Sequence, residues 1–335
     1  MAEKQIPPAM FTPRFRTDIY PYLYPSKYRG SLQNKVAIIT GAAGAIGQAL
    51  AESFAVAGAK LVLTYNNTPP PPELKEKCIR FGAVGVEFVR CNVAELEGCE
   101  ALVKQTFNLY GEVDILVNNA GANGLGPVYA QDPRNFVHDL AVNLHGPYYL
   151  MRLLLPHFRE RRSGCVLNIA SRAGTVAIPY STSYCASKAA LINLTACTQK
   201  EMDIEGLDDV HLYALHPGGI KSTMTLKKYA KDSILSLPPQ AQAIFANQLD
   251  IYNDSPYLNG MVCVALATGV GRRALRGKYV DVGQDLEDVL AQADALAADP
   301  DLYMLHTRFL GELTNAGVPP GGYHAEEVKF EFPGF

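Results

Sequence analysis

The stretch Val36-Ala-Ile-Ile-Thr-Gly-Ala-Ala-Gly-Ala-Ile-Gly47 decides the fold of this chain. Its first residues form a short apolar run, which is typical of a strand buried on both faces of a sheet. Glycines follow, and residues 48–57 then have helical spacing up to Gly58. A glycine turn between a strand and a helix lets backbone N–H groups approach a pyrophosphate, and the helix N-terminus adds a favourable field. The stretch therefore predicts a phosphate-binding turn in an α/β domain.

The alternation of apolar runs and helical patterns continues after this turn. Apolar runs predict further strands at residues 61–65, 86–90, 115–117, 166–169, 211–215 and 278–282. Helical spacing predicts helices at residues 94–109, 135–158, 183–194 and 258–267, and one more that begins near residue 72. Because alternating strands and helices imply right-handed crossovers, we expect an α/β Rossmann fold. It would have a doubly wound parallel sheet of about seven strands with helices on both faces.

The composition is that of a soluble globular protein. The 335 residues are 48% hydrophobic and 19% charged with a formal net charge of -3, which gives no reason to expect nucleic acid or a membrane surface as a partner. The N-terminal residues lack the apolar core of a secretory signal, and no apolar run is long enough to span a bilayer. Seven cysteines without a CxxC pair indicate free thiols in a reducing compartment. We expect a cytoplasmic protein without a metal site.

Two terminal regions flank the expected domain, residues 32–283. Residues 1–31 interleave prolines with aromatic side chains, which predicts an extended arm that docks on the domain or on a neighbouring subunit. A disordered leader is the alternative. Residues 284–335 form a C-terminal extension, with one helix expected at residues 286–297 and a second near residues 300–313.

One expected helix carries a candidate catalytic pair. Tyr184 and Lys188, at i and i+4, project from the same helix face. Because a fixed ammonium beside a phenol favours the phenolate, we expect Lys188 to lower the pKa of Tyr184 from about 10 toward neutral. Such a phenol could exchange a proton with a substrate oxygen near neutral pH. The spacing alone is also typical of a pair on a solvated helix surface.

These features resemble the short-chain dehydrogenase/reductase family over residues 32–283. Residues 40–47 resemble its TGxxxGxG turn, and residues 118–121 match its NNAG motif. Asn143 matches the Asn of the following helix, and Ser171 ends a strand at the family's usual interval before Tyr184. Tyr184 and Lys188 are its YxxxK motif, and Pro217-Gly218 matches its PG turn.

The resemblance implies a role for each of these residues. Tyr184 would be the general acid/base, and Ser171 would donate a hydrogen bond to the same substrate oxygen. Lys188 would lower the pKa of Tyr184 and bind the nicotinamide ribose, and Asn143 would hold a water that connects Lys188 to solvent. Taken alone, Ser171 and Asn143 would be an ordinary strand-end hydroxyl and an ordinary helix amide. The implied cofactor-binding residues are Gly41, Gly44, Ile46, Gly47, Tyr65, Asn66, Asn67, Asn92, Val93, Asn119, Ala120, Gly121, Tyr184, Lys188, Pro217, Gly218, Ile220 and Ser222.

Three positions depart from the family pattern. Ala45 stands at the second glycine, with Gly44 one place earlier, and its methyl would crowd a pyrophosphate slightly. Asn92 replaces the Asp that usually meets the adenine, and it still offers a carbonyl acceptor. Ser222, with Thr223 beside it, stands where Thr is usual.

The choice of cofactor is expected to depend on the end of the second strand. NAD enzymes place Asp or Glu there to hold the ribose 2′-hydroxyl. Tyr65-Asn66-Asn67 has no carboxylate to repel a 2′-phosphate, and Tyr-Asn-Asn-Thr resembles the neutral phosphate pocket of some NADPH-using members. No Arg or Lys occupies either usual phosphate-clamping position. On balance we expect NADP(H) in preference to NAD(H).

The resemblance implies an NADP(H)-dependent carbonyl reductase or alcohol dehydrogenase. By hydride transfer, with Tyr as general acid/base, it would interconvert a carbonyl and a secondary alcohol on a small, largely apolar substrate. The alternatives are a cofactor-independent lyase or isomerase on the same fold, and a cofactor-binding scaffold without turnover. The retained Lys188 argues against the lyase, and the complete Asn-Ser-Tyr-Lys set argues against the scaffold.

Residues 221–257 lie where the family carries a mobile substrate lid. Their apolar side chains predict an apolar pocket, and a solvated amphipathic hairpin is the alternative. These side chains are Leu226, Tyr229, Ile234, Leu235, Leu237, Ile244, Phe245 and Tyr252.

The helices around Asn143 and after Tyr184 carry more apolar residues than one sheet face needs. Family members pair these helices across a two-fold axis. We therefore expect a homodimer, or a homotetramer if residues 284–335 leave the second axis free. The alternative is that the N-terminal arm covers this patch and keeps the chain monomeric.

Overall fold

A parallel sheet of seven strands forms the centre of the molecule. The computed structural model describes residues 10–228 and 230–309. The strands lie in the order β3-β2-β1-β4-β5-β6-β7, and every pairing is parallel. The expected doubly wound α/β Rossmann fold is confirmed, and the strand order reverses between β1 and β4. The strands are β1 Val36–Ile39, β2 Lys60–Tyr65, β3 Gly85–Arg90, β4 Ile115–Asn118, β5 Gly164–Ile169, β6 Val210–His216 and β7 Tyr279–Asp281.

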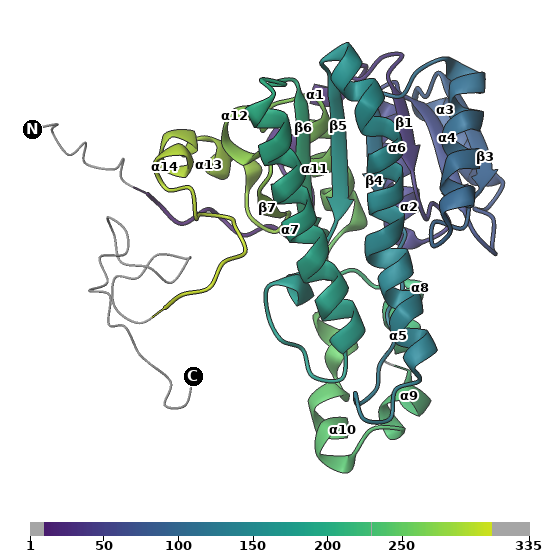
Figure 1. Cartoon of the computed structure of the whole chain (residues 1–335), viewed down its shortest axis with the longest axis vertical. Helices are drawn as coiled ribbons and strands as arrows, with labels where there is room; N and C mark the ends of the chain where they lie inside the picture. The colour runs from purple at the N-terminus through teal and green to yellow at the C-terminus, as the bar shows by residue number, and fades with distance from the viewer. Residues whose placement is uncertain (1–9, 229, 310–335) are drawn as a thin grey trace, which may run out of the picture.

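Helices cover both faces of the sheet (Figure 1). Successive residues of a strand point to opposite faces. Ala37 and Ile39 therefore join the core under one set of helices, whereas Ile38 joins the core under the other. This burial on both faces explains why the strands are continuous apolar runs in the sequence. The first set is α2 Ala45–Val56, α3 Glu73–Phe81 and α11 Pro256–Ala267, and the second is α4 Leu96–Tyr110, α6 Gly146–Arg161 and α7 Thr182–Ile204.

The N-terminal arm belongs to the main core. Its helices η1 Pro21–Leu23 and α1 Pro25–Tyr28 pack beside α11, and α1 also contacts α2. The Tyr20 hydroxyl accepts a hydrogen bond of 2.6 Å from the N–H of Leu286. Residues 20–32 therefore dock on the main domain, on the sheet face opposite α6 and α7. The arm contributes the buried side chains Tyr20, Leu23, Tyr28 and Leu32 to this core.

The long helix expected at residues 135–158 is present over residues 133–161, and it contains one π-helical turn that was not expected. It consists of α5 Pro133–Leu140, a π-helical turn η2 Ala141–His145, and α6. Pro147 has no N–H and cannot donate the α-helical hydrogen bond to the carbonyl of Asn143. Gly146 also packs so closely on Val93 that an added Cβ would lie 2.8 Å from the Val93 carbonyl oxygen. Apolar spacing continues through the turn and therefore does not reveal it.

Residues 221–257 fold into short helices beyond the carboxyl end of the sheet, the end to which the β5 arrow points (Figure 1). Leu237 and Phe245 are buried in a small core of this segment, against which Tyr180 packs. Leu226, Leu235 and Ile244 are exposed, and Tyr229 lies outside the described residues. Much of the apolar surface expected in a pocket therefore holds the lid itself together or faces solvent. The helices are α8 Thr223–Lys228, α9 Lys231–Leu235, α10 Pro239–Phe245 and η4 Gln248–Ile251.

The C-terminal extension contains less helix than expected. The single helix expected at residues 286–297 is two short ones, α13 Leu286–Leu290 and α14 Ala293–Ala298, which follow α12 Arg272–Leu275 and β7. Residues 301–309 contain no helix, and the rest of the second expected helix lies outside the described residues. Within residues 10–228 and 230–309, no helix has the length and apolarity to cross a bilayer, and no His, Cys, Asp and Glu side chains gather into a metal-binding group.

Candidate active site

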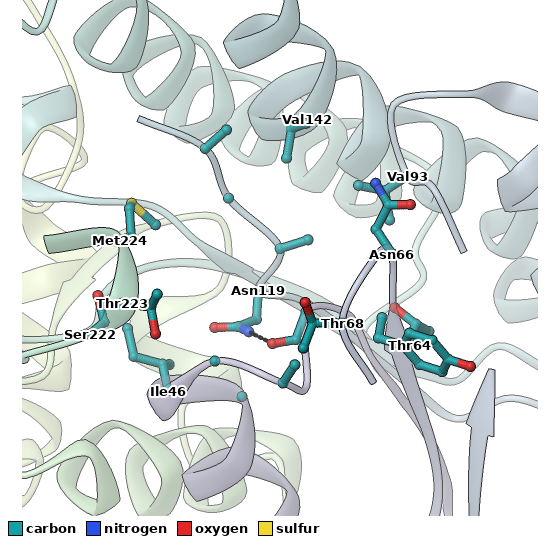
Figure 2. Close-up of a pocket in the computed structure, with 18 of the residues that line it drawn as sticks. Ile46, Thr64, Asn66, Thr68, Val93, Asn119, Val142, Ser222, Thr223 and Met224 are labelled. Carbon is teal, nitrogen blue, oxygen red and sulfur yellow. Dashed lines mark hydrogen bonds between the residues drawn. The ribbon is translucent and has the colours of Figure 1, made fainter. Parts of the chain in front are cut away.

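Hydrogen bonds from the residues that follow β4 fix the glycine turn after β1. The Thr40 hydroxyl oxygen accepts from the N–H groups of Asn119 and Ala120, each at 2.9 Å. The Asn119 side chain donates to the carbonyl oxygens of Thr40 at 2.8 Å and Gly41 at 3.2 Å. Figure 2 shows this amide directed at the turn. Because β1 and β4 flank the point where the strand order reverses, these bonds hold together the two sides of the crevice in which such folds bind ligands.

Two glycines of this turn cannot be replaced without moving the backbone. Gly41 has φ of +68°, and an added Cβ would lie 2.9 Å from the Cα of Ala120. An added Cβ at Gly47 would lie 2.3 Å from the carbonyl oxygen of Gly41. The first turn of α2 therefore packs directly on the glycine turn. This close approach presents backbone N–H groups and a helix N-terminus together, as pyrophosphate binding requires.

A cavity of about 320 Å³ lies against the turn (Figure 2). Its position and its glycine cradle fit the pyrophosphate and adenosine parts of a dinucleotide. The expected cofactor residues that line it are Gly41, Gly44, Ile46, Gly47, Tyr65, Asn66, Asn92, Val93, Asn119, Ala120, Gly121 and Ser222. Ala45 and Thr223, noted above, also line it. Ala43, inside the glycine turn, and Thr68, the last residue of Tyr-Asn-Asn-Thr, line it as well. Lining residues that the sequence did not indicate are Thr64, Cys91, Ala122, His138, Val142 and Met224. Most of these residues are next to motif residues in the sequence, and this adjacency could have identified them as cavity-lining residues.

The other expected cofactor residues do not line this cavity: Asn67, Tyr184, Lys188, Pro217, Gly218 and Ile220. Asn67 is exposed beyond the end of β2, and Pro217 and Ile220 are buried. The turn around Gly218 packs on Asp254, whose carboxylate accepts a 2.6 Å hydrogen bond from the N–H of Gly219. Lid residues Ser222, Thr223 and Met224 form this wall of the cavity instead (Figure 2).

The Asn92 side chain, expected to meet the adenine, bonds within its own loop. Its oxygen accepts from the N–H of Ala94 at 3.2 Å, and its amide nitrogen donates to Glu95 at 2.8 Å. The expected acceptor is therefore already engaged by the protein.

An arginine lies at the end of β2. Arg90 ends β3 and is the register partner of Tyr65 in the neighbouring strand β2. Its Nε donates to the carbonyl oxygen of Asn66 at 3.2 Å. An exposed guanidinium therefore stands beside the segment on which cofactor choice is expected to depend. Arg90 is distant along the chain and reaches β2 only through strand pairing, so the sequence of the β2 loop did not indicate it.

Ser171, Tyr184 and Lys188 lie together where β5 ends and α7 begins. The Ser171 side chain interacts with the Tyr184 phenol and acts to lower its pKa. The Lys188 Nζ lies 5.6 Å from the centroid of the Tyr184 ring and donates to the carbonyl oxygen of Ile169 at 2.7 Å. The fold thus brings these three side chains to the carboxyl end of the sheet.

Burial governs the protonation of both ionisable groups. It raises the pKa of Tyr184 to about 12, although the interaction with Ser171 acts in the opposite direction. It lowers the pKa of Lys188 to about 8. The expectation that the pKa of Tyr184 falls toward neutral is therefore wrong for this structure. Burial destabilises the phenolate by more free energy than the neighbouring groups stabilise it.

The Asn143 side chain is buried and is hydrogen-bonded to Ala122 and Ser187. Its oxygen accepts from the N–H of Ala122 at 2.9 Å, and its nitrogen donates to the Ala122 carbonyl at 2.8 Å and to the Ser187 hydroxyl at 3.1 Å. Asn143 therefore ties the loop after β4 to α7, one residue before Lys188. It lies in the π-helical turn η2, a feature frequent at functional sites.

A second lysine faces Tyr184. Lys228, the last residue of α8, is 7% exposed, and its Nζ lies 5.7 Å from the Tyr184 ring centroid. The side-chain oxygen of Asn123 accepts from this ammonium at 3.0 Å in the amide orientation that satisfies both groups. Buried Asp139 lies in the same region and accepts from the Ser183 hydroxyl at 2.6 Å. Lys228, Asn123 and Asp139 belong to no sequence motif. Only the folding of the lid brings Lys228 close to Tyr184.

The chain is similar to known proteins over most of its length. Residues 35–233 match the family described as short chain dehydrogenase. A short chain dehydrogenase of Pseudocercospora fijiensis is 31% identical over 285 residues, which cover 84% of this chain and 90% of that protein. A 3-oxoacyl-acyl-carrier-protein reductase of Staphylococcus aureus is 29% identical over 67% of this chain and 90% of its own.

A solved structure gives the same result. A metagenomic short-chain oxidoreductase in complex with NADP is 26% identical, with a TM-score of 0.58, over 71% of this chain and 92% of that chain. The family match extends over more than half of the residues, and the fold has the strand order and glycine turn of a dinucleotide-binding domain. The chain therefore belongs to the short-chain dehydrogenase/reductase family of NAD(P)-using oxidoreductases.

Proposed function

We propose that the chain is an NADP(H)-dependent oxidoreductase that interconverts a carbonyl and a secondary alcohol on a small organic substrate. The observation that carries this proposal is that the Ser171 hydroxyl and the Tyr184 phenol interact, with the Lys188 ammonium 5.6 Å from the centroid of the phenol ring. A hydroxyl and a phenol placed together can bind one substrate oxygen, and the phenol can exchange a proton with it.

In the direction of reduction, Ser171 donates a hydrogen bond to the carbonyl oxygen, and Tyr184 transfers its phenolic proton to that oxygen as negative charge develops. The bound cofactor supplies the hydride. Burial supports the role of acid because it raises the pKa of Tyr184 to about 12, so the phenol carries its proton at neutral pH. The Lys188 ammonium then stabilises the phenolate that remains.

Lys188 and Asn143 are proposed to return a proton from solvent to Tyr184. Burial lowers the pKa of Lys188 to about 8, so this group can exchange a proton near physiological pH. The side chain of Asn143 is engaged by Ala122 and Ser187. We therefore assign the water-holding role to its backbone carbonyl, to which Pro147 cannot donate the usual helical hydrogen bond.

The preference for NADP(H) is supported by the charges around the end of β2. Tyr65-Asn66-Asn67 presents no carboxylate, and the Arg90 guanidinium is hydrogen-bonded to the Asn66 carbonyl. A cation favours a 2′-phosphate, whereas a carboxylate would repel it. The similar metagenomic oxidoreductase was determined in complex with NADP.

Turnover of a panel of ketones and aldehydes with NADPH and with NADH tests the proposed reaction. Tyr184→Phe should retain cofactor binding and lose roughly 10²- to 10⁴-fold in turnover, the usual contribution of a general acid/base. Tyr129→Phe, which alters a phenol that is 83% exposed, is the matched control. Wild-type turnover by Tyr184→Phe would exclude Tyr184 as the acid. Cofactor binding without turnover of any substrate would favour the scaffold alternative, and turnover without cofactor would favour the lyase.

Titration of both cofactors tests the proposed preference. We expect NADPH to bind more tightly than NADH, and Arg90→Ala to weaken NADPH binding more than NADH binding. Tyr65→Asp should reverse the order because it sets a carboxylate against the 2′-phosphate. Arg80→Ala removes an exposed arginine from α3 and serves as the control. Equal affinities, or tighter NADH binding by the wild type, would contradict the assignment.

A further inference from the structure

Two cysteines lie together beside the cofactor cavity. Cys91 follows β3 and lines the cavity, and Cys99 lies near the start of α4. The Cys91 thiol donates to the carbonyl oxygen of Gly98 at 3.4 Å, and this carbonyl belongs to the peptide bond with Cys99. The Cys99 thiol donates to the carbonyl oxygen of Val93 at 3.6 Å. Each sulfur therefore lies against the backbone within two residues of the other cysteine.

The interaction of the two thiols makes Cys91 the more acidic one. It lowers the pKa of Cys91, against the effect of burial, and it raises the pKa of Cys99. Burial instead raises the pKa of Cys78 to about 12, and it also raises that of Cys165. Because the thiolate and not the thiol attacks an oxidant, Cys91 should react in preference to these buried cysteines.

The loop between the two cysteines forms part of the cavity wall. Asn92 and Val93 both line the cavity. An added Cβ at Gly98 would lie 2.7 Å from the carbonyl oxygen of Asn92, so the start of α4 already packs closely on this loop. Gly146 packs equally closely on Val93, where an added Cβ would lie 2.8 Å from the carbonyl oxygen. Because a covalent bond brings two sulfurs closer than two thiols in contact, its formation would move the loop and change the cavity.

We propose that Cys91 and Cys99 form a redox modification site, at which a peroxide converts the two thiols into a disulfide that weakens cofactor binding. The Cys91 thiolate attacks one oxygen of hydrogen peroxide, so that an S–O bond forms, the O–O bond breaks and hydroxide leaves. The Cys99 sulfur then attacks the Cys91 sulfur, so that an S–S bond forms and the S–O bond breaks. Water leaves with the Cys99 proton. The two thiols lose two electrons, and the peroxide gains them.

Cofactor and oxidant would exclude each other at this site. Cys91 is 4% exposed, and the cavity of about 320 Å³ that it lines gives a small peroxide a route to its sulfur. A cofactor in the cavity would block this route. By linkage, a disulfide that weakens cofactor binding is itself disfavoured by bound cofactor to the same extent. This inference goes beyond the proposed reaction, because it concerns cofactor binding and not turnover.

Peptide mapping tests whether the disulfide forms. Trypsin releases residues 91–104 as one peptide, because Arg90 and Lys104 are the flanking cleavage sites. After treatment of the full chain with hydrogen peroxide, this peptide should have lost two hydrogens and should no longer react with iodoacetamide. NADPH added before the peroxide should slow this change. Dithiothreitol should restore both thiols.

Titration with NADPH before and after oxidation tests the effect on cofactor binding. The oxidised chain should bind NADPH roughly tenfold more weakly than the reduced chain, within the usual range of such couplings. Cys99→Ala should bind NADPH equally well before and after peroxide treatment, because it cannot form the disulfide. Cys197→Ala, at an exposed cysteine of α7, is the matched control and should respond as the wild type does. NADH is titrated in parallel, so that an error in the proposed cofactor preference does not affect the result.

The outcomes separate this inference from the proposed function. Oxidation of Cys197 that leaves residues 91–104 reduced would overturn the redox site, and so would a disulfide that leaves the affinity for both cofactors unchanged. If Cys99→Ala does not fold, the wild type decides, and a loss of affinity that dithiothreitol does not reverse would refute the proposal. Binding of cofactor without turnover of any ketone would refute the proposed reaction and leave the redox site intact.

Discussion

His211 is a buried titratable residue outside the proposed chemistry. It lies in β6, is 6% exposed, and packs edge-on against Tyr213 with 5.5 Å between ring centroids. No partner for its Nδ1 is found among the described residues. Burial, and to a lesser extent Arg276, lowers the pKa of His211 to about 4. The folded state therefore holds this ring neutral.

This histidine should make the protein sensitive to acid. An unfolded histidine binds a proton below about pH 6.5, so between that value and about pH 4 the unfolded state binds more protons than the folded one. Stability is then complete above the unfolded pKa and falls as the pH drops, by roughly 3 kcal/mol over this range. His211→Phe should flatten this part of the profile of unfolding free energy against pH, measured with urea. Burial also lowers the pKa of His216 to about 4. His216 therefore contributes equally to the profiles of the wild type and of His211→Phe. His306→Phe, at an exposed histidine, is the control. Parallel profiles for His211→Phe and the wild type would contradict the expectation.

At the scale of elements, the glycine turn depends on contact between backbones. An alanine at position 47 would place its Cβ 2.3 Å from the carbonyl oxygen of Gly41, and the next atom, Cα of Ala42, is 2.7 Å away. Neither is a flexible side chain, so the turn or α2 must move. We expect Gly47→Ala to lose at least about 1 to 3 kcal/mol of stability and to bind NADPH at least roughly tenfold more weakly.

Gly126→Ala is the matched control for this change. Nothing lies within 4 Å of an added Cβ at Gly126, and this glycine is outside the cavity lining. Thermal unfolding and cofactor titration of both variants check the prediction. Equal behaviour of the two variants would mean that the turn does not need the close contact seen here.

The elements differ in how far the sequence could predict them. Strands buried on both faces are continuous apolar runs in the sequence. The predicted bounds of β1 to β7 therefore agree with those of the structure to within a few residues. The π-helical turn at Asn143 depends on the missing N–H of Pro147 and on the contact of Gly146 with Val93, which lies in another loop. The order Ser171, Tyr184, Lys188 could be predicted because the motif is local. Arg90 and Lys228 could not, since strand pairing and lid folding bring them to the site.

At the scale of the whole molecule, the faces of α6 and α7 remain the expected site of a homodimer. Residues 20–32 pack beside α2 and α11, and residues 11–16 contact residues 283–292, so the described part of the arm does not cover those faces as the monomeric alternative required. Tyr148 of α6 is 48% exposed, and Val137 of the preceding α5 is 61% exposed. Soluble monomers rarely leave such side chains together in water.

Sedimentation of the full chain should therefore show a dimer, or a tetramer. Tyr148→Glu should shift the equilibrium toward monomer because it places a charge in an apolar contact. Ile79→Glu, at a side chain that is 47% exposed on α3, should not. A wild-type monomer would refute the proposed assembly. Deletion of residues 1–30 is unsuitable for this test because it removes Tyr20, Leu23 and Tyr28 from the core.

The arm also joins parts of the molecule that are distant in the sequence. The Thr17 carbonyl accepts a 2.8 Å hydrogen bond from the N–H of Ser255, which lies near the end of the lid and directly before α11. The Arg172 guanidinium, next to Ser171, lies 5.7 Å from the centroid of the Phe15 ring. Arg16 pairs at 2.9 Å with Asp285, whose side chain is fully buried. The arm thus contacts the segment after Ser171, the end of the lid and the C-terminal extension.

Arg16→Met tests whether these contacts hold the domain together. The change leaves the Asp285 carboxylate buried with Arg14 as its remaining guanidinium, at 3.4 Å. Removing one partner of a buried pair costs about 3 to 5 kcal/mol when nothing replaces it. Because Arg14 stays, we expect a loss of about 2 kcal/mol in the free energy of urea unfolding.

Arg29→Met, at an exposed arginine of the same arm, should change stability by less than about 0.5 kcal/mol. The arm shares its core with α2 and α11. The loss of stability in Arg16→Met should therefore shift the single cooperative unfolding transition of the domain. A separate early transition, or no change, would show that the arm docks without stabilising the fold.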